Sequence, residues 1–192
     1  MAATSTQLLP LLAPAPDFAL PDTTSGRTVR RADYDGRPLL VMFLCNHCPY
    51  VKHLNRGLVE LAREYQAKGL AVVAISSNDV TAYPEDGPDE MRRRAAELEY
   101  PFPYLFDETQ AVARAYRAAC TPDFFLFDAE GRLAYRGQFD ESRPGKDVPV
   151  TGRDLRAAAD AVLAGAPVPA PQRPSIGCSI KWRAGGAPGY AA

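Results

Sequence analysis

Two continuous apolar runs of strand length constrain most strongly how this chain can fold. They span residues 37–45 (RPLLVMFLC) and 69–76 (GLAVVAIS). Continuous rather than alternating apolar runs are typical of strands buried on both faces of a sheet. Between them, apolar residues recur at helical spacing from Leu54 to Tyr65, and Gly69 ends the expected helix. The pattern predicts two parallel strands joined by a crossover helix.

The remaining segments continue this order of strands and helices. They are, in chain order, a hairpin over 17–31, a loop over 77–90 that leads into a helix near Pro88, a strand at 102–107, a helix at 108–119, a hairpin over 123–140 and a helix at 151–165. For the last helix, Thr151 is the expected N-cap and Gly165 the expected stop. This order predicts an α/β fold with a central mixed β-sheet flanked by helices.

The length of 192 residues fits one domain with tails. Residues 1–16 are rich in Thr, Ser, Pro and Ala, and we expect a flexible N-terminal arm there. Residues 17–165 form the expected domain. Residues 166–192 are rich in Pro and Gly and are expected to pack on the domain as an extended tail.

Charge and hydropathy argue against several classes of partner. The net charge is −1, which gives no basic surface for nucleic acid and no polybasic segment for a membrane. No apolar run reaches the roughly 18 residues that a membrane-spanning helix needs. The N-terminus has no basic residue before its Leu-rich patch, which is unlike a secretory signal. We therefore expect a cytoplasmic protein, in which four cysteines serve catalysis or metal binding rather than structural disulfides.

The motif CNHCP joins the first buried strand to its helix. The carboxyl ends of strands in α/β sheets are where chemistry gathers. A helix N-terminus stabilises a thiolate through its free N–H groups, so Cys45 is expected to be the more exposed nucleophile with the lower pKa. Cys48 would then resolve the mixed disulfide, and a protonated His47 would stabilise the thiolate. Pro49 fits the first helical position, where its missing N–H costs little.

The motif and its placement resemble the active site of the thioredoxin superfamily. More narrowly, residues 17–182 resemble its TlpA-like or peroxiredoxin-like branch, the AhpC/TSA-type redoxins. The segments that carry this resemblance are PAPDFALPD, NHCPYVKH, ISSNDVTAYPEDGPDEM, YPFPYLFDETQAVARAY, TPDFFLFD and PSIGCSIKW. The resemblance implies a thioredoxin-like fold with a peroxiredoxin-like insertion over 77–119. It also implies that Pro122 is a cis-proline beside the dithiol and that Thr121 faces the substrate.

Two departures from the family pattern concern individual positions. Typical peroxiredoxins carry PxxxTxxC, and aligning Cys48 with the last residue puts Val41 and Cys45 where Pro and Thr belong. Plain thioredoxin has a buried aspartate six residues before its first cysteine, and Leu39 occupies that position. The proton acceptor for Cys48 is therefore open, with Glu60, Glu64 and Asp123 as candidates.

The function expected from these residues is thiol–disulfide exchange at Cys45 and Cys48. The substrate is a disulfide-containing protein or a small thiol, and a thioredoxin-type donor recharges the pair. No cofactor and no metal are expected, because the dithiol carries both electrons. The first alternative is a thiol-dependent peroxidase in which Cys48, Cys45 or Cys120 resolves a sulfenic acid. A metal-binding or interaction module, with Cys120 and Cys178 completing a zinc site, is the other alternative.

Several residues keep two interpretations. Cys120 is a candidate for an additional redox thiol or a small buried apolar residue. Cys178 either folds back over the active site or only packs. Asn78 and Asp79 line a substrate groove or belong to a solvated loop, and the solvated loop is favoured. Trp182 is expected to anchor the tail to the domain.

Overall fold

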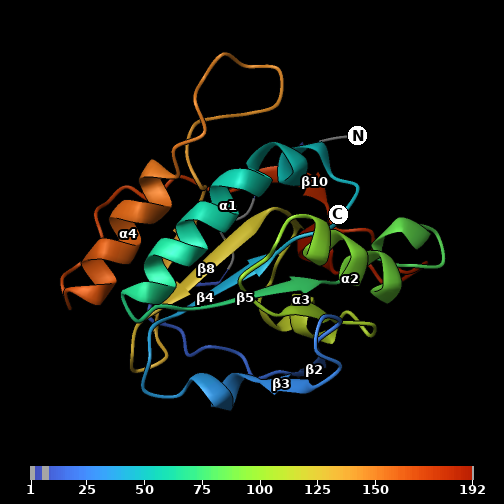
Figure 1. The fold of residues 1–192 in the computed structure, drawn as a ribbon, viewed down its shortest axis with the longest axis horizontal. Helices are drawn as coiled ribbons and strands as arrows, with labels where there is room; N and C mark the ends of the chain where they lie inside the picture. The colour runs from blue at the N-terminus through green and yellow to red at the C-terminus, as the bar shows by residue number, and fades with distance from the viewer. Residues whose placement is uncertain (1–2, 6–8, 192) are drawn as a thin grey trace.

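The computed structural model describes residues 3–5 and 9–191, and Figure 1 shows a central sheet between two layers of helices and connections. Five strands form the central sheet in the order β6-β5-β4-β8-β9. Their bounds are Leu39–Phe43 (β4), Ala71–Ser76 (β5), Tyr104–Phe106 (β6), Asp123–Phe127 (β8) and Leu133–Gly137 (β9). β4, β5 and β6 are parallel, whereas β8 runs antiparallel to β4 and β9 runs antiparallel to β8. The prediction of a mixed α/β sheet is confirmed.

The two buried strands β4 and β5 are covered on both faces, as their continuous apolar runs predict. Leu40, Met42 and Leu44 point into one core with the helices α1 (Pro49–Ala67), α2 (Pro88–Glu97) and α4 (Arg153–Leu163). The alternate residues of β4 point into the other core, which also contains side chains of α3 (Ala111–Ala115). Figure 1 shows α1 and α4 above the sheet, with α3 and the N-terminal hairpin below.

Two smaller sheets complete the fold. The expected N-terminal hairpin is present, with β2 (Ala19–Pro21) antiparallel to β3 (Thr28–Arg30). A three-stranded sheet has the order β1-β10-β7, where β1 is Ala3–Ser5, β10 is Ile176–Ser179 and β7 is Cys120–Thr121. Among the described residues, three 3-10 helices lie at Arg31–Tyr34 (η1), Pro84–Asp86 (η2) and Gly189–Ala191 (η3). In this small sheet, the tail strand β10 contacts the helix α1.

Two local expectations are wrong. The helix predicted over 108–119 is only α3, because Gln110 (φ 63°) and Arg117 (φ 51°) take left-handed backbone conformations at its two ends. α4 has Gly152 (φ 67°) as its N-cap in place of Thr151. Gly152 suits that place because its left-handed φ is costly for other residues. Pro88 is the first residue of α2, as expected.

The arm and the tail both contact the domain. Residues 1, 2, 6–8 and 192 lie outside the described residues. Leu12 N–H donates to the Leu133 carbonyl at 2.8 Å, and the Tyr116 hydroxyl donates to the Pro16 carbonyl at 3.0 Å. Trp182 packs against the core beneath the sheet and stacks with the Arg114 guanidinium at 5.1 Å, which supports its expected anchoring role.

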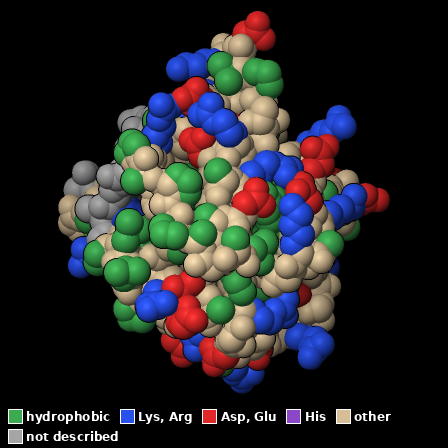
Figure 2. Space-filling model, turned by 90° about the vertical axis from the view of Figure 1, so that its left-hand side faces the viewer, with side chains coloured by type: hydrophobic (Ala, Val, Ile, Leu, Met, Phe, Trp, Pro, Cys, Tyr) green, Lys and Arg blue, Asp and Glu red, His purple; other side chains and the backbone are tan. Residues whose placement is uncertain are grey.

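The surface has no single dominant charge on the face that carries α4. Figure 2 shows hydrophobic side chains in the middle of that face, with Lys and Arg interspersed with Asp and Glu around them. None of the described helices combines the length and hydropathy that crossing a membrane requires.

Candidate active site

The two cysteines of the CNHC motif lie at the junction of β4 and α1. Cys45 follows the end of β4, and Cys48 is the N-cap of α1 with Pro49 as its first helical residue. Pro49 fits there because the first N–H groups of a helix have no partner within the helix. The placement expected from the sequence is confirmed. It brings both sulfur atoms to the carboxyl end of the central parallel strands.

Thr121 and Pro122 meet the dithiol from the other side. The peptide bond between them is cis, as expected. Cys45 Sγ lies 3.2 Å from the Thr121 hydroxyl oxygen, and Cys48 Sγ lies 3.1 Å from the Thr121 carbonyl oxygen. One residue therefore contacts both sulfur atoms, although Thr121 and the dithiol are more than 70 positions apart in the sequence.

Both thiols are buried, which differs from the expectation of an exposed Cys45. The exposed fraction is 1% for Cys45 and 0% for Cys48. All four cysteines are in the free thiol form. The sequence could not indicate this burial, because the residues that cover the pair come from distant segments.

The electrostatics of the pair also reverse the expected assignment of the thiolate. A hydrogen bond from the Cys45 thiol is the largest cause that lowers the pKa of Cys48 to about 5. Hydrogen bonds from the Cys178 thiol and from the backbone N–H groups of Val51 and Cys178 act in the same direction, whereas burial opposes them. The Thr121 carbonyl also opposes a thiolate at Cys48, since it can only accept a hydrogen bond. The hydrogen-bond donors around the Cys48 sulfur outnumber this one acceptor, so the pKa of Cys48 is lowered.

The pKa of Cys45 is raised for the matching reasons. Its hydrogen bond to the Cys48 sulfur is the largest cause, followed by burial and by the negative charge of Asp86, while the Thr121 hydroxyl opposes them. These opposite shifts favour the proton on Cys45 and the negative charge on Cys48. The helix N-terminus still stabilises the thiolate, but at its N-cap residue Cys48.

Asp86 is a site residue that the sequence did not single out. It belongs to η2 in the insertion and has an exposed fraction of 0%. Its carboxylate accepts hydrogen bonds from Asn46 N–H (2.7 Å), His47 N–H (3.3 Å), His47 Nδ1 (2.7 Å) and Asn78 Nδ2 (2.7 Å). The only signal was its place in the polar stretch YPEDGP, which cannot distinguish Glu85 from Asp86.

The three proton-acceptor candidates named from the sequence lie elsewhere. Glu60 and Glu64 are exposed on α1, where they pair with Arg56 and Lys68. Asp123 is buried on β8, and its charge is one of the causes that raise the pKa of Cys120, after the larger effect of burial. Asp86 is the carboxylate that reaches the CNHC loop.

His47 connects this carboxylate to the surface. Its ring stacks on Tyr83 with centroids 5.1 Å apart and an interplanar angle of 13°. With Nδ1 bound to Asp86, the ring orientation is fixed from two sides. Asn78 is buried rather than part of a solvated loop, because its side chain also accepts the Lys181 N–H at 2.8 Å. Asp79 N–H in turn donates to the Lys181 carbonyl at 2.8 Å.

The other two cysteines differ in their relation to the dithiol. Cys178, in β10, lies opposite Thr121 and its side chain hydrogen-bonds the Cys48 sulfur. The Cys120 sulfur lies 3.5 Å from the Pro122 carbonyl oxygen, and burial raises its pKa well above the usual value. The tail therefore does fold back over the dithiol.

One group of metal-ligand type exists among the described residues. Donor atoms of Cys45, His47 and Asp86 lie within 4.8 Å of one another. However, His47 Nδ1 and Asp86 Oδ2 are 2.7 Å apart, a hydrogen-bonding distance. Two ligands of a tetrahedral zinc ion at bonds of about 2.0 Å would lie about 3.3 Å apart. The arrangement fits a hydrogen-bonded pair better than a metal centre.

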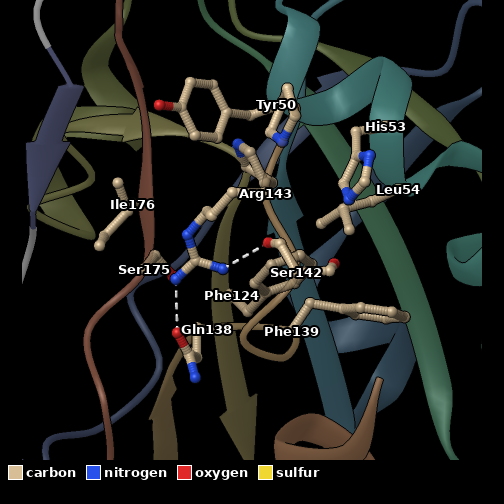
Figure 3. Close-up of a pocket in the computed structure, with 12 residues that line it drawn as sticks. Tyr50, His53, Leu54, Phe124, Gln138, Phe139, Ser142, Arg143, Ser175 and Ile176 are labelled. Carbon is tan, nitrogen blue, oxygen red and sulfur yellow. Dashed lines mark hydrogen bonds between the residues drawn. The ribbon is translucent and has the colours of Figure 1, made fainter. Parts of the chain in front are cut away.

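Two hollows border the site. Figure 3 shows one between α1, β10 and the segment after β9, where Arg143 lies across it and donates to Gln138 and to the Ser142 carbonyl. Its volume of about 10 Å³ has room for one water at most. The other is a polar cleft of about 370 Å³ that borders Asn46 and His47 and is lined by charged residues of both signs. The cleft is the larger approach to the CNHC loop.

The comparisons with known proteins agree with this geometry. The AhpC/TSA family matches residues 12–136. The chain belongs to the AhpC/TSA family. The chain is also 28% identical over 119 residues to the thiol-disulfide oxidoreductase ResA of Geobacillus thermodenitrificans (strain NG80-2). That alignment covers 62% of this chain and 64% of ResA, which is less than two thirds of the relative.

Solved structures extend the likeness over nearly the whole chain. An uncharacterized conserved protein of Geobacillus kaustophilus is 54% identical with a TM-score of 0.93, over 95% of this chain and 97% of that one. A hypothetical protein of Sinorhizobium meliloti 1021 is 50% identical with a TM-score of 0.92, over 94% of this chain and 99% of that one. A thiol:disulfide interchange protein of Chlorobium tepidum TLS, 17% identical with a TM-score of 0.62 over 82% and 99%, shares the fold.

Proposed function

We propose that this AhpC/TSA-family protein is a thiol–disulfide oxidoreductase that exchanges a dithiol and a disulfide at Cys45 and Cys48. The observation that carries the proposal is the pair itself, because two thiols that share a proton both lie against Thr121. The lowered pKa leaves Cys48 as a thiolate that can take up the Cys45 proton when Cys45 attacks the partner. The likeness to ResA adds independent support.

Exchange begins when Cys45 attacks a sulfur of the partner's disulfide. A bond forms between Cys45 Sγ and that sulfur, and the partner's S–S bond breaks to release a thiolate. The proton of Cys45 passes to the Cys48 sulfur along their hydrogen bond. Cys45 is the proposed nucleophile because the next two residues, Asn46 and His47, line the polar cleft, whereas Cys48 is hydrogen-bonded by Cys178 of β10.

The second step resolves the mixed disulfide. Cys48 gives its proton to the released thiolate and attacks Cys45 Sγ. The Cys45–Cys48 disulfide forms, and the partner's second sulfur leaves as a thiolate that takes a proton from water. Two electrons and one proton have then moved from the pair to the partner, the partner's second proton has come from water, and no bound cofactor takes part.

His47 and Asp86 position the loop and set where its charge lies. Asp86 holds two backbone N–H groups of the loop and the His47 ring. Its negative charge disfavours a thiolate at Cys45, so the resting charge is directed to Cys48. Thr121 and Pro122 are the proposed contacts for the partner's backbone.

The proposed substrate is a disulfide-containing protein or a small thiol. The cleft beside His47 is lined by three basic residues and three acidic ones, so it suits a small polar thiol. A thioredoxin-type reductant is the proposed electron donor, which follows from the cytoplasmic location that we propose from the sequence.

Trapping the mixed disulfide tests the proposal. Reduced Cys48→Ser protein is mixed with a disulfide-linked peptide, quenched with acid and mapped by peptide mass. We expect the peptide to be bound at Cys45, because the proposed resolving thiol, Cys48, is absent. Reduced wild-type protein should instead release the peptide and form the Cys45–Cys48 disulfide. The proposal fails if wild-type protein neither reduces the peptide nor forms that disulfide.

A thiol peroxidase is the second candidate, favoured by the family match and by the lowered pKa of Cys48. In that reaction the Cys48 thiolate attacks a hydroperoxide, an alcohol leaves, and Cys45 resolves the sulfenic acid with loss of water. Consumption of hydroperoxide with dithiothreitol as reductant separates the two candidates. A rate that matches disulfide exchange, and that disappears in Cys48→Ser, would favour the peroxidase.

A further inference from the structure

The active site contains a third thiol that the proposed exchange does not use. This thiol belongs to Cys178 in β10, and the exposed fraction of Cys178 is 3%. Its side chain hydrogen-bonds the Cys48 sulfur, and its backbone N–H also contributes a hydrogen bond to that sulfur. The Cys48 sulfur therefore has one thiol neighbour in its own loop, Cys45, and a second in the tail.

The backbone around Cys178 is held closely against the cis-proline loop. Cys178 lies opposite Thr121 in the antiparallel pair of β10 and β7, and Ile180 N–H donates to the Ala119 carbonyl at 2.9 Å. A Cβ atom added at Gly177 would lie only 2.1 Å from the Thr121 carbonyl oxygen. Glycine at that position lets the tail strand approach the residue that contacts both Cys45 and Cys48.

We propose that Cys178 is a third redox thiol of this site and that it exchanges with the dithiol through Cys48. The Cys178 thiol loses its proton as its sulfur attacks Cys48 Sγ of the Cys45–Cys48 disulfide. A bond forms between Cys178 and Cys48, the bond between Cys45 and Cys48 breaks, and Cys45 leaves as a thiolate that takes up the proton lost by Cys178. The number of electrons is unchanged, so the step needs no oxidant beyond the one that made the first disulfide.

This step rests on the proposed function, because that function supplies the Cys45–Cys48 disulfide. Its consequence is that the oxidised protein has two isomers. One holds the disulfide within the CNHC loop, and the other joins α1 to β10 and leaves Cys45 as a free thiol. The tail thus takes part in the chemistry of the pair that it covers.

Cys120 does not fit the same role, although it lies next to Thr121. Its sulfur lies 3.5 Å from the Pro122 carbonyl oxygen, and its exposed fraction is 0%. Cys178 contributes two of the hydrogen bonds that lower the pKa of Cys48, whereas Cys120 is not among the main causes of that shift. Cys120→Ala is therefore a matched control that removes a buried thiol of the same neighbourhood.

The experiment locates disulfides in wild-type, Cys45→Ser and Cys45→Ser/Cys120→Ala proteins. Each full-length protein is reduced, equilibrated with excess glutathione disulfide, alkylated in acid and mapped by peptide mass. Wild-type protein should show Cys45–Cys48 with a smaller share of Cys48–Cys178. In Cys45→Ser, glutathione first binds Cys48, Cys178 displaces it, and the share of Cys48–Cys178 should rise at least about tenfold. Removal of Cys120 should leave that share unchanged.

The outcomes separate this inference from the function on which it rests. If wild-type protein forms Cys45–Cys48 but Cys45→Ser stays glutathionylated at Cys48 with Cys178 free, the third-thiol proposal is overturned and the exchange function stands. A disulfide from Cys48 to Cys120 in the variant also overturns it. If wild-type protein never forms Cys45–Cys48, the exchange function fails, whereas a Cys48–Cys178 bond in the same sample still supports the pairing proposed here.

Discussion

The dithiol lies between two regions that act on it in opposite ways. The segment over residues 77–119 brings the Asp86 carboxylate toward Cys45, where its negative charge adds to the hydrogen bond with Cys48 and to burial in raising the pKa of the thiol. The tail brings Cys178 toward Cys48, where a side-chain and a backbone hydrogen bond lower the pKa. The first region disfavours a thiolate and the second favours one.

The difference teaches that helix position alone does not decide which cysteine of a CxxC motif is ionised. Both cysteines are near the start of α1, and the helix N-terminus favours a thiolate at each. Asp86 and Cys178 break the symmetry, because one is an anion and the other is a hydrogen-bond donor. The proton is therefore held on Cys45 and the charge on Cys48.

Replacing the cysteines one at a time should give the largest effects. Cys45→Ser and Cys48→Ser should each lower the rate of disulfide exchange at least about a thousandfold, because the two thiols act as one unit. The thiolate absorbance at 240 nm should distinguish the two variants at pH 7. Cys45→Ser should keep this absorbance because hydrogen-bond donors remain around Cys48, whereas Cys48→Ser should lose it because the ionised sulfur is gone. Cys120→Ala should keep both rate and absorbance. A thiolate that persists in Cys48→Ser would reverse the assignment.

Moving the tail away from the site should have the next largest effect. Gly177→Ala places a Cβ atom 2.1 Å from the Thr121 carbonyl oxygen, so β10 must shift. We expect a loss of about 1–3 kcal/mol in the free energy of unfolding and faster alkylation of Cys48 and Cys178 by iodoacetamide.

Gly189→Ala is the matched control for that prediction. Gly189 also lies in the tail, and a Cβ atom there would meet nothing within 4 Å. This variant should match wild-type protein in thermal unfolding and in alkylation rate. Equal alkylation rates in the two glycine variants would show that β10 does not shield the dithiol.

Removing the negative charge of Asp86 should sharpen the comparison between the two regions that contact the dithiol. Asp86→Asn removes the charge that raises the pKa of Cys45, so that pKa should fall. The loss of charge-assisted hydrogen bonds should also cost about 1.5–3 kcal/mol of unfolding free energy. The checks are alkylation of Cys45 as a function of pH and urea unfolding. Asp89→Asn, which changes an exposed carboxylate of α2, is the control and should alter neither.

The smallest effect is on the pH dependence of the reduction potential. Above about pH 5 the reduced pair holds one proton, and below it holds two, because Cys48 then becomes protonated. Reduction takes up these protons, so the potential should fall with rising pH. The slope should be about 59 mV per unit below pH 5 and about 30 mV above it. A slope of about 59 mV up to pH 8 would mean that neither thiol has a lowered pKa.

The sequence predicted what depends on local pattern. The strands β4 and β5, the helix between them and the place of Cys45 and Cys48 follow from apolar runs and spacing, because a strand buried on both faces has few alternatives. The cis bond at Thr121-Pro122 followed from the family resemblance.

The sequence did not predict what depends on contacts between distant segments. Asp86 reaches the CNHC loop across about 40 positions, and nothing local separates it from its acidic neighbour. Cys178 reaches Cys48 through strand pairing in a tail whose composition indicates only a loose segment. The burial of Cys45 and the directions of the two pKa shifts follow from these contacts, so the expectation of an exposed Cys45 with the lower pKa, drawn from helix position alone, was wrong.

The most direct test of the central claim is a redox titration of metal-free, full-length protein in glutathione buffers. Thiols are trapped with an alkylating mass tag, and the tagged peptides are identified by mass. We predict a reversible two-electron transition in which the Cys45–Cys48 disulfide accounts for most of the oxidised protein. A titration in which Cys45 and Cys48 never form a disulfide with each other would contradict the account.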